Sequence, residues 1–403
     1  MRYIRTIMVC TLPLLFSLCS APGQTSFEFD YQGAESMIKV LQAVHDGASR
    51  DTVAALLDHM VQLEAYRVSE ERNTQSTRSQ DNHVSLSQFR AFISSFLDDT
   101  VATQGNKRLM MQKDWYATAI KDPARFEGAI QTLRSIPEAE YDAAFDLALH
   151  WLPDETVLDA RIWVLFDIGG SGGWMYRTSD GTDHIGFNLL HMVDETGKFH
   201  RELFLGTLAH ELQHMGRPLE DYYTLIDYDS LADTSRLKLY TDFFSQIIKE
   251  GMANKFCSNA PSRFSSPVNP DKAFAADETG VENWEFFSQE LVDIHARAVR
   301  DLRAILNDQV DDPDQFWTDY RNYWTWWAGE SEGRRFVLGR RYYYGAELLG
   351  AIHQAFGREL LLNATADIRR VPALYNDALR ELQPPDYELY LFPDEVVQGV
   401  GEL

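Results

Sequence analysis

The chain has 403 residues, 45% of them hydrophobic and 24% charged, which is typical of a globular protein large enough to bury a substantial core. Its formal net charge of −24 argues against nucleic acid or an anionic membrane as a partner, because both are polyanions. A well-solvated surface is sufficient to explain this charge, and the sequence locates no acidic groove.

Residues 1–23 have the pattern of a secretory signal peptide. Two arginines precede an apolar run over residues 6–18, which is too short to span a bilayer, and small residues follow it. We therefore expect cleavage within residues 21–23 and a secreted or periplasmic protein. A lipid anchor on Cys19 is the less favoured alternative, because the residue before it is large for a lipidation signal. Cys257 would then be the remaining cysteine, so no internal disulfide is expected.

Residues 24–152 are predicted to form a mostly helical N-terminal region. Apolar residues recur at helical spacing over 27–66 and again over 87–151. The polar stretch 67–85 between them is expected to be an exposed loop. This region could cover a cleft in the rest of the protein.

The pattern changes at residue 153. Residues 157–170 are rich in β-branched and apolar side chains and end in glycine, which predicts a strand. A turn-rich connection over 171–183 leads to a second predicted strand at the edge of a sheet, residues 184–192. A strong helical pattern follows over 199–215.

The C-terminal part is predicted to be helical again, and its tail, 382–403, is Pro-rich and acidic and is expected to pack as extended chain. In an aromatic segment, Trp324 and Trp327 would share a helix face. Such a face suits a carbohydrate or peptide ligand but is more often part of the core. The helical patterns cover 237–257, 285–306 and 342–361.

The stretch TLAHELQHMG, residues 207–216, carries the strongest functional signal. His210 and His214 are four residues apart on a predicted helix, so their side chains lie on one face and can bind one metal ion. Glu211 lies beside them and can reach a metal-bound water. Imidazole suits zinc, and three protein ligands leave a fourth position open. The alternative is two partly exposed histidines on an ordinary amphipathic helix.

A third ligand is required, and two glutamates are candidates. Glu250 lies on a later predicted helix and is followed by Gly251 and Ala253, whose small size would let this helix pack close to the first. Glu220 lies six residues after His214, where a chain reversal could bring it back.

The HELQH motif, with EGMAN on a later helix, resembles the gluzincin zinc metallopeptidases, and the chain is similar to a bacterial family of zinc-dependent peptidases of unknown function. The resemblance covers about residues 160–257. It implies that His210, His214 and Glu250 bind one zinc ion and that Glu211 is the general base. The metzincin pattern fits worse, because that class has glycine where Arg217 stands.

The resemblance also points to a tyrosine. Several gluzincins place a tyrosine three residues before a glycine at a helix start, where it stabilises the transition state. In RRYYYGAELLGAI this position corresponds to Tyr342, three residues before Gly345, although Tyr343 and Tyr344 are close enough to replace it. Three tyrosines packed at a helix start are the alternative.

Other charged side chains near these motifs have less specific interpretations. The arginines around Tyr342 would bind a substrate carboxylate or offset the acidic surface. The histidines that precede the motif helix are expected not to be ligands. The arginines are Arg334, Arg335, Arg340 and Arg341, and the histidines are His184, His191 and His200.

These observations predict an α+β fold that is mostly helical. A zincin-like catalytic region with a small sheet, the HExxH helix and a helical C-terminal part would occupy 153–403. The predicted function is an exported zinc metallopeptidase that cleaves peptide or protein substrates with a zinc-activated water, and the strand at 186–190 would pair with an extended substrate. Alternatives are an exported binding protein with a structural or vestigial zinc site, and a zinc hydrolase of non-peptide amides.

Overall fold

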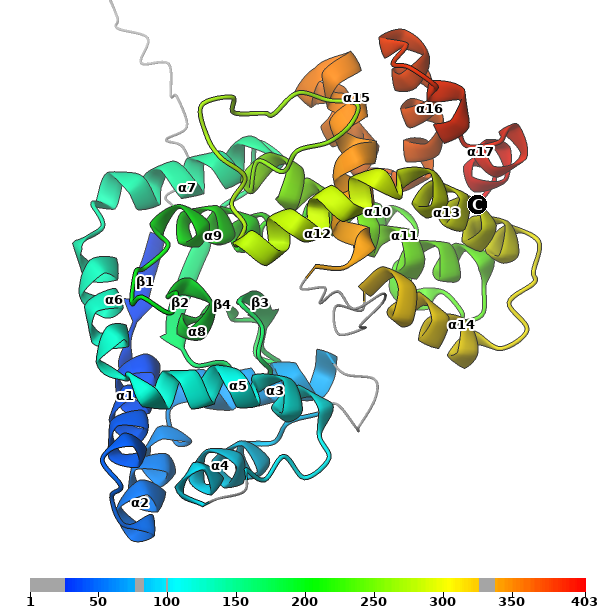
Figure 1. Ribbon diagram of the computed structural model, residues 1–403. Helices are drawn as coiled ribbons and strands as arrows, with labels where there is room; N and C mark the ends of the chain where they lie inside the picture. Colours follow the sequence, from blue (N-terminus) through cyan, green and yellow to red (C-terminus); the bar gives the residue numbers. More distant parts are fainter. Residues whose placement is uncertain (1–25, 77–82, 99–100, 326–337) are drawn as a thin grey trace, which may run out of the picture.

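The computed structural model (Figure 1) describes residues 26–76, 83–98, 101–325 and 338–403. Within these ranges helices predominate and one small sheet is present, so the α+β, mostly helical expectation is confirmed. None of the helices in the described residues is both long and apolar enough to cross a membrane. Several sequence expectations fall outside these ranges: the signal peptide with Cys10 and Cys19, and the side chains of Trp327, Arg334 and Arg335.

The N-terminal region is helical apart from its first residues, and one predicted loop in it was wrong. Residues 67–76 belong to helix α3, Glu64–Ser76. The helix lacks an apolar stripe because polar side chains face the interior: Ser69 and Asn73 are fully buried. The other helices here are α1 Gln32–His45, α2 Arg50–Met60, α4 Leu86–Ser94, α5 Lys107–Lys121, α6 Ala124–Ser135 and α7 Glu138–His150.

The sheet has four strands in the order β1-β2-β4-β3. Strands β1, β2 and β4 are parallel, and β3 runs antiparallel to β4. The bounds are β1 Ser26–Asp30, β2 Asp159–Leu165, β3 Gly173–Arg177 and β4 Asp183–Asn188. The strand β2 agrees with the sequence, whereas β1 was expected to be helix and β3 to be loop.

The position of β4 also corrects the sequence interpretation. It lies between β2 and β3 rather than at the edge, and residues 189–192 form a short helix, α8. A Cβ on Gly186 would lie 2.2 Å from the Trp174 ring, so the missing side chain makes room for the tryptophan of β3. Because both sides of β4 are paired, a substrate cannot add to it; the edge strands, each with a free side, are β1 and β3.

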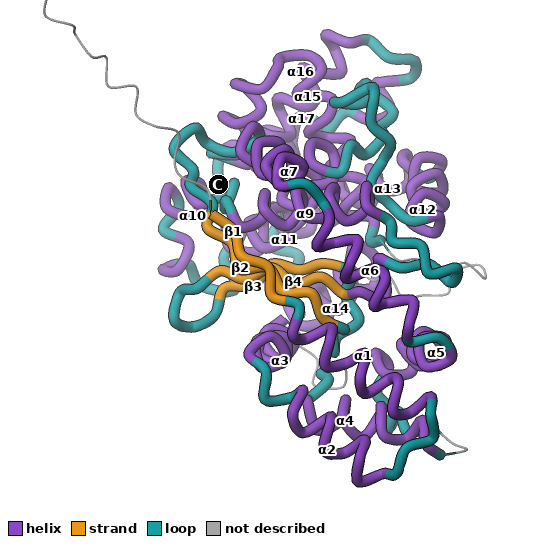
Figure 2. The backbone as a smooth tube through the Cα atoms, turned by 90° about the vertical axis from the view of Figure 1, so that its left-hand side faces the viewer, coloured by secondary structure: helices purple, strands orange, loops and turns teal. Residues whose placement is uncertain are grey.

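Helices cover both faces of the sheet (Figure 2). On one face, helix α9, Arg201–Met215, packs against β4, where the rings of Phe187 and Phe204 have centroids 4.7 Å apart. On the other face lie α1 and α3, and the guanidinium of Arg72 on α3 stacks over Trp174 of β3. The strand β3 therefore has the motif helix on one face and the N-terminal region on the other.

The C-terminal part is helical, and its tail is not extended as expected, because Val396 and Val400 are buried one helical turn apart in α17. Trp324 is fully buried and its indole N–H donates to Asp301, as expected of a core residue. The helices are α10 Glu220–Leu225, α11 Arg236–Met252, α12 Glu278–Gln289, α13 Leu291–Leu306, α14 Pro313–Tyr320, α15 Arg340–Thr365, α16 Val371–Leu382 and α17 Asp394–Gly401.

Helices α11 and α15 cross with almost no space between their backbones. A Cβ on Gly251 of α11 would lie 2.3 Å from the carbonyl carbon of Gly345 on α15. Gly251 was expected to bring α11 close to the motif helix, but it faces α15 instead. The π-helical turn Ala253–Cys257 after α11 makes the contact with α9. The glycine crossing places the end of α11 beside the start of α15.

Candidate metal centre

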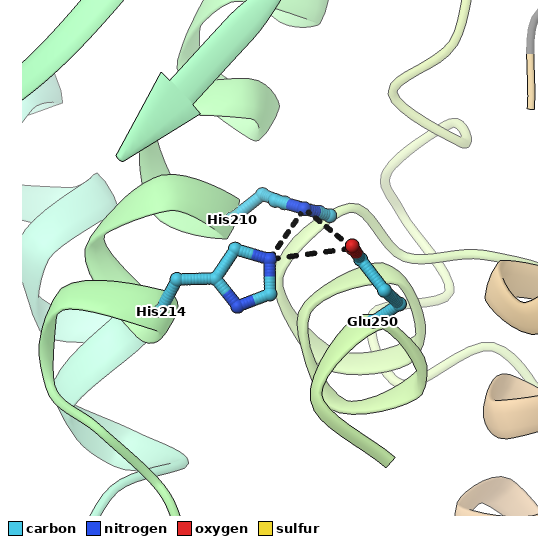
Figure 3. Close-up of side chains that lie close together, drawn as sticks. All are labelled: His210, His214 and Glu250. Carbon is cyan, nitrogen blue, oxygen red and sulfur yellow. Dashed lines mark hydrogen bonds and ion pairs between the residues drawn. The ribbon is translucent and has the colours of Figure 1, made fainter. Parts of the chain in front are cut away.

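Three side chains from two helices converge on one point (Figure 3). His210 and His214 are one turn apart on α9, and their Nε2 atoms lie 3.0 Å from each other. Glu250 reaches them from α11: its Oε2 atom lies 3.5 Å from His210 Nε2 and 3.3 Å from His214 Nε2. Glu220 is exposed at the start of α10 and does not belong to this cluster.

The cluster has dimensions that fit a zinc ion. Ligand atoms in tetrahedral zinc sites lie about 2.0–2.1 Å from the metal, which puts them about 3.3 Å from one another. The three donor atoms are separated by 3.0, 3.3 and 3.5 Å. Glu250 Oε2 is buried and has no hydrogen-bond partner among the described residues. A cation between the three atoms would satisfy this oxygen and both facing nitrogens.

The second carboxylate oxygen of Glu250 is bound by an arginine. Arg341, at the start of α15, donates from Nη2 to Glu250 Oε1 at 2.9 Å. Burial alone would raise the pKa of Glu250, but Arg341 and the two histidines outweigh burial and hold it well below its usual range. Glu250 is therefore an anion held in one orientation. Arg341 and Arg340 both have partners inside the protein: Arg341 pairs with Glu250, and Arg340 pairs with Glu290.

Glu211 lies beside the cluster but is not part of it. It is 6% exposed, and burial raises its pKa to about 7, although His210 opposes this effect. Its carboxylate accepts a hydrogen bond from the backbone N–H of Met175 on β3. A bound dication would lower this pKa, because it favours the carboxylate form. Glu211 is thus fixed between the histidine pair and the edge strand β3.

The structure separates the three tyrosines at the start of α15. Tyr342 lines the pocket beside the cluster, with its ring 6.5 Å from that of His210. Burial raises the pKa of Tyr342 to about 12, so it keeps its proton at neutral pH. Tyr343 is buried against Trp284, and Tyr344 is hydrogen-bonded to His295 in the core.

A pocket of about 300 Å³ opens next to the cluster, and it includes residues that the sequence did not single out. Arg72 from α3 and Trp115 from α5 line one end, so the N-terminal region forms part of its wall. The glycine-rich segment 170–173 lines the same end. The two glycine pairs at 169–170 and 172–173, shortly after the predicted strand, are a signal for close backbone approach that could have identified this segment.

The histidines that were expected not to be ligands lie away from the three donor atoms. His184 is buried and stacked on Trp163, and His200 pairs with Asp194. His191 lines the pocket, where its Nε2 atom lies 3.2 Å from the carbonyl oxygen of Gly170.

Comparison with known proteins gives one match. A family model described as "Putative zinc dependent peptidase (DUF5700)" matches residues 57–383, which include α3, the histidine helix, Glu250 and Tyr342. No curated protein and no solved structure matches the chain. The similarity to a bacterial zinc-dependent peptidase family that the sequence suggested is confirmed, over a much longer stretch than the motifs alone. The chain belongs to this family.

Proposed function

We propose that the protein is an exported zinc metallopeptidase with a gluzincin-type site in a zincin-like core. The observation that carries the proposal is the convergence of His210, His214 and Glu250 beside Glu211, at the wall of an open pocket. The family description supports a zinc-dependent peptidase. Export is supported by the sequence of residues 1–23.

The ligand set favours a catalytic site over a structural one. Structural zinc sites usually have four protein ligands and are closed, whereas catalytic sites have three and keep a position open. Three donors are grouped among the described residues, and a pocket adjoins them. An exported binding protein with a structural site is therefore the weaker alternative. Hydrolysis of a non-peptide amide uses the same chemistry, but the family description favours peptides.

The residues around the cluster have separate roles in the proposed reaction. Zinc, when bound, supplies Lewis-acid chemistry, which lowers the pKa of a bound water and polarises a substrate carbonyl. Glu211 accepts the proton of the attacking water and passes it to the leaving amine. Arg341 keeps Glu250 ionised and oriented, as outer partners of metal ligands commonly do.

The strand β3 is the better candidate for binding an extended substrate. Asn188 N–H donates to Gly172 O, and Trp174 pairs with Gly186 of β4. Because amide groups alternate along a strand, those of Gly173 and Met175 point to its free side, where the N–H of Met175 is already bound by Glu211 and the backbone of Gly173 is the group left for a substrate. Gly173 also lines the pocket, where a Cβ would lie 2.6 Å from Thr207. A peptide paired with β3 would pass beside Glu211.

A Tyr342→Phe variant is expected to lose about 10²–10³-fold in kcat with little change in KM, as is typical when one transition-state donor is removed. Tyr342 lines the pocket, whereas Tyr343 is packed against Trp284, so Tyr343→Phe serves as the control and should keep kcat. Steady-state kinetics would be measured with zinc content in parallel. A fully active Tyr342→Phe enzyme would remove this hydroxyl from the mechanism.

Metal analysis of the purified wild-type protein, combined with cleavage of a peptide library, tests the proposal as a whole. We expect about one zinc per chain and cleavage that a chelator abolishes and added zinc restores. Tight zinc without cleavage of any peptide would favour the binding-protein alternative. Protein without tight zinc would contradict the peptidase proposal and leave a binding protein with a vestigial site.

A further inference from the structure

The pocket beside the metal cluster has one cationic side chain in its lining. Among the described residues that line it, Arg72 is the one arginine or lysine. It comes from α3, in the N-terminal region, and its side chain is 16% exposed. The pocket also contains the carboxylate of Glu211, whose pKa Arg72 lowers. The two charges are therefore within electrostatic reach of each other.

The contacts of Arg72 leave part of its guanidinium without a partner. Its Nη2 donates to Ser171 Oγ at 3.0 Å, and the group stacks 5.2 Å from the centre of the Trp174 ring. Its Nη1 is buried and makes no hydrogen bond in the described part of the chain. This Nη1 faces the carboxylate of Asp167, whose Oδ2 lies 4.0 Å from it. That distance is too long for a hydrogen bond.

Asp167 cannot come closer because other donors hold it. Its Oδ1 accepts from Ser69 Oγ at 2.8 Å and from Trp174 Nε1 at 3.1 Å, and its Oδ2 accepts from Ser171 N at 2.9 Å. Asp167 also lies near a second arginine, Arg108, and burial together with Arg72 lowers the pKa of Arg108 to about 10. Two partly buried arginines thus lie near one fully buried carboxylate, Asp167, which hydrogen-bonds to neither of them.

We propose that Arg72 binds a carboxylate of the substrate, so that the preferred substrates are peptides with a carboxylate close to the scissile bond. This inference rests on the proposed peptidase function. A guanidinium presents N–H groups in a planar fork that matches a carboxylate, and its attraction is stronger in a pocket with little water. The carboxylate belongs either to the C-terminus of the peptide or to an Asp or Glu side chain, and both sources offer Arg72 the same chemistry.

Arg161 provides a matched control for Arg72. Its guanidinium stacks over Trp163 at 5.6 Å, on the same sheet face, and pairs with Glu64. It does not line the pocket. Replacement by glutamine removes the charge and the stacking at both positions but removes a pocket cation only at Arg72.

The experiment compares three forms of one peptide that the zinc-loaded wild-type protein cleaves: with a free C-terminus, with a C-terminal amide, and with its Asp or Glu changed to Asn or Gln. We expect the wild type to prefer one carboxylate about 10–100-fold in kcat/KM, as is typical of a hydrogen bond between charged groups. The form that loses activity identifies the source. Arg72→Gln should erase the preference, mainly through KM, and Arg161→Gln should keep it.

Binding gives a second readout that does not depend on turnover. Calorimetric binding affinities of the zinc-loaded Glu211→Gln protein for the three peptides should show the same preference. The double variant Glu211→Gln, Arg72→Gln should not show it. Arg72→Lys, which keeps the charge but not the fork, replaces Arg72→Gln if that variant does not fold, and it should reduce the preference in part. Cleavage without a carboxylate preference, or with one that the Arg72 variants retain, overturns this inference and leaves the peptidase proposal intact. Failure of the wild type to cleave any peptide overturns the peptidase proposal and this inference with it.

Discussion

A Glu250→Ala variant is expected to lose tight zinc binding, whereas Glu220→Ala should keep it. Glu250 Oε2 faces both histidine nitrogens within 3.5 Å, and Glu220 is exposed outside the cluster. Loss of one of three protein ligands should weaken zinc binding by more than the roughly 10–100-fold typical of losing an outer partner. Removal also leaves the cationic Arg341 buried without its carboxylate partner, which adds a cost in stability.

The measurement is a competition titration of zinc against a chelator, with circular dichroism to verify folding. Glu220→Ala is a matched control, since it removes a carboxylate close in sequence to the same histidines. Equal zinc affinity in the two variants, or weaker binding by Glu220→Ala, would contradict the ligand set His210, His214 and Glu250.

A Glu211→Gln variant is expected to keep its zinc and its fold but to lose about 10²–10⁴-fold in kcat, as is typical when a general base is removed. Glutamine has the size of glutamate but cannot accept the proton of the attacking water. Glu211 is outside the three-atom cluster, so zinc content should not change. KM should change little, because the interaction strengthens mainly in the transition state.

The control for Glu211→Gln is Glu202→Gln, the same substitution at an exposed position of the same helix. It should retain wild-type kinetics. The experiment requires kcat, KM and zinc content for both variants on any peptide that the wild type cleaves. Full activity in Glu211→Gln would overturn the hydrolase proposal and leave a zinc-binding protein without catalysis.

The geometry of the histidine pair was predictable from sequence because it is local. Four residues of helix determine that His210 and His214 share a face, whatever the rest of the chain does. Glu250 was a harder case, since its approach to α9 depends on tertiary packing. Its small neighbours correctly indicated close packing. However, Gly251 packs against Gly345 of α15, and the π-helical turn after Met252 is the part that contacts α9.

The other end of the pocket was not predictable in this way. In helix α3 the buried side chains of Ser69 and Asn73 are polar, and they hydrogen-bond to Asp167 and Val84. Because these inward-facing residues are polar, the sequence shows no apolar residues at helical spacing there. The role of Arg72 in the pocket wall was missed for that reason. The strand β3 was taken for a loop because its five residues begin in a glycine-rich turn, although it forms a hairpin with β4 and the Asp180-Gly181 turn between them is a hairpin signal in the sequence.

The glycine crossing between α11 and α15 has a consequence for how the pocket can evolve. Glu250 precedes Gly251 directly, and Tyr342 lies one turn before Gly345. The positions of both side chains therefore depend on the contact between the two glycines. A methyl group at either glycine would push the helices apart and move both side chains. A mutation there must be accompanied by a compensating change in the facing helix, whereas Arg72 and Trp115 of the N-terminal wall take no part in this backbone contact. Diversification of specificity within such a scaffold is therefore expected to proceed through the N-terminal wall.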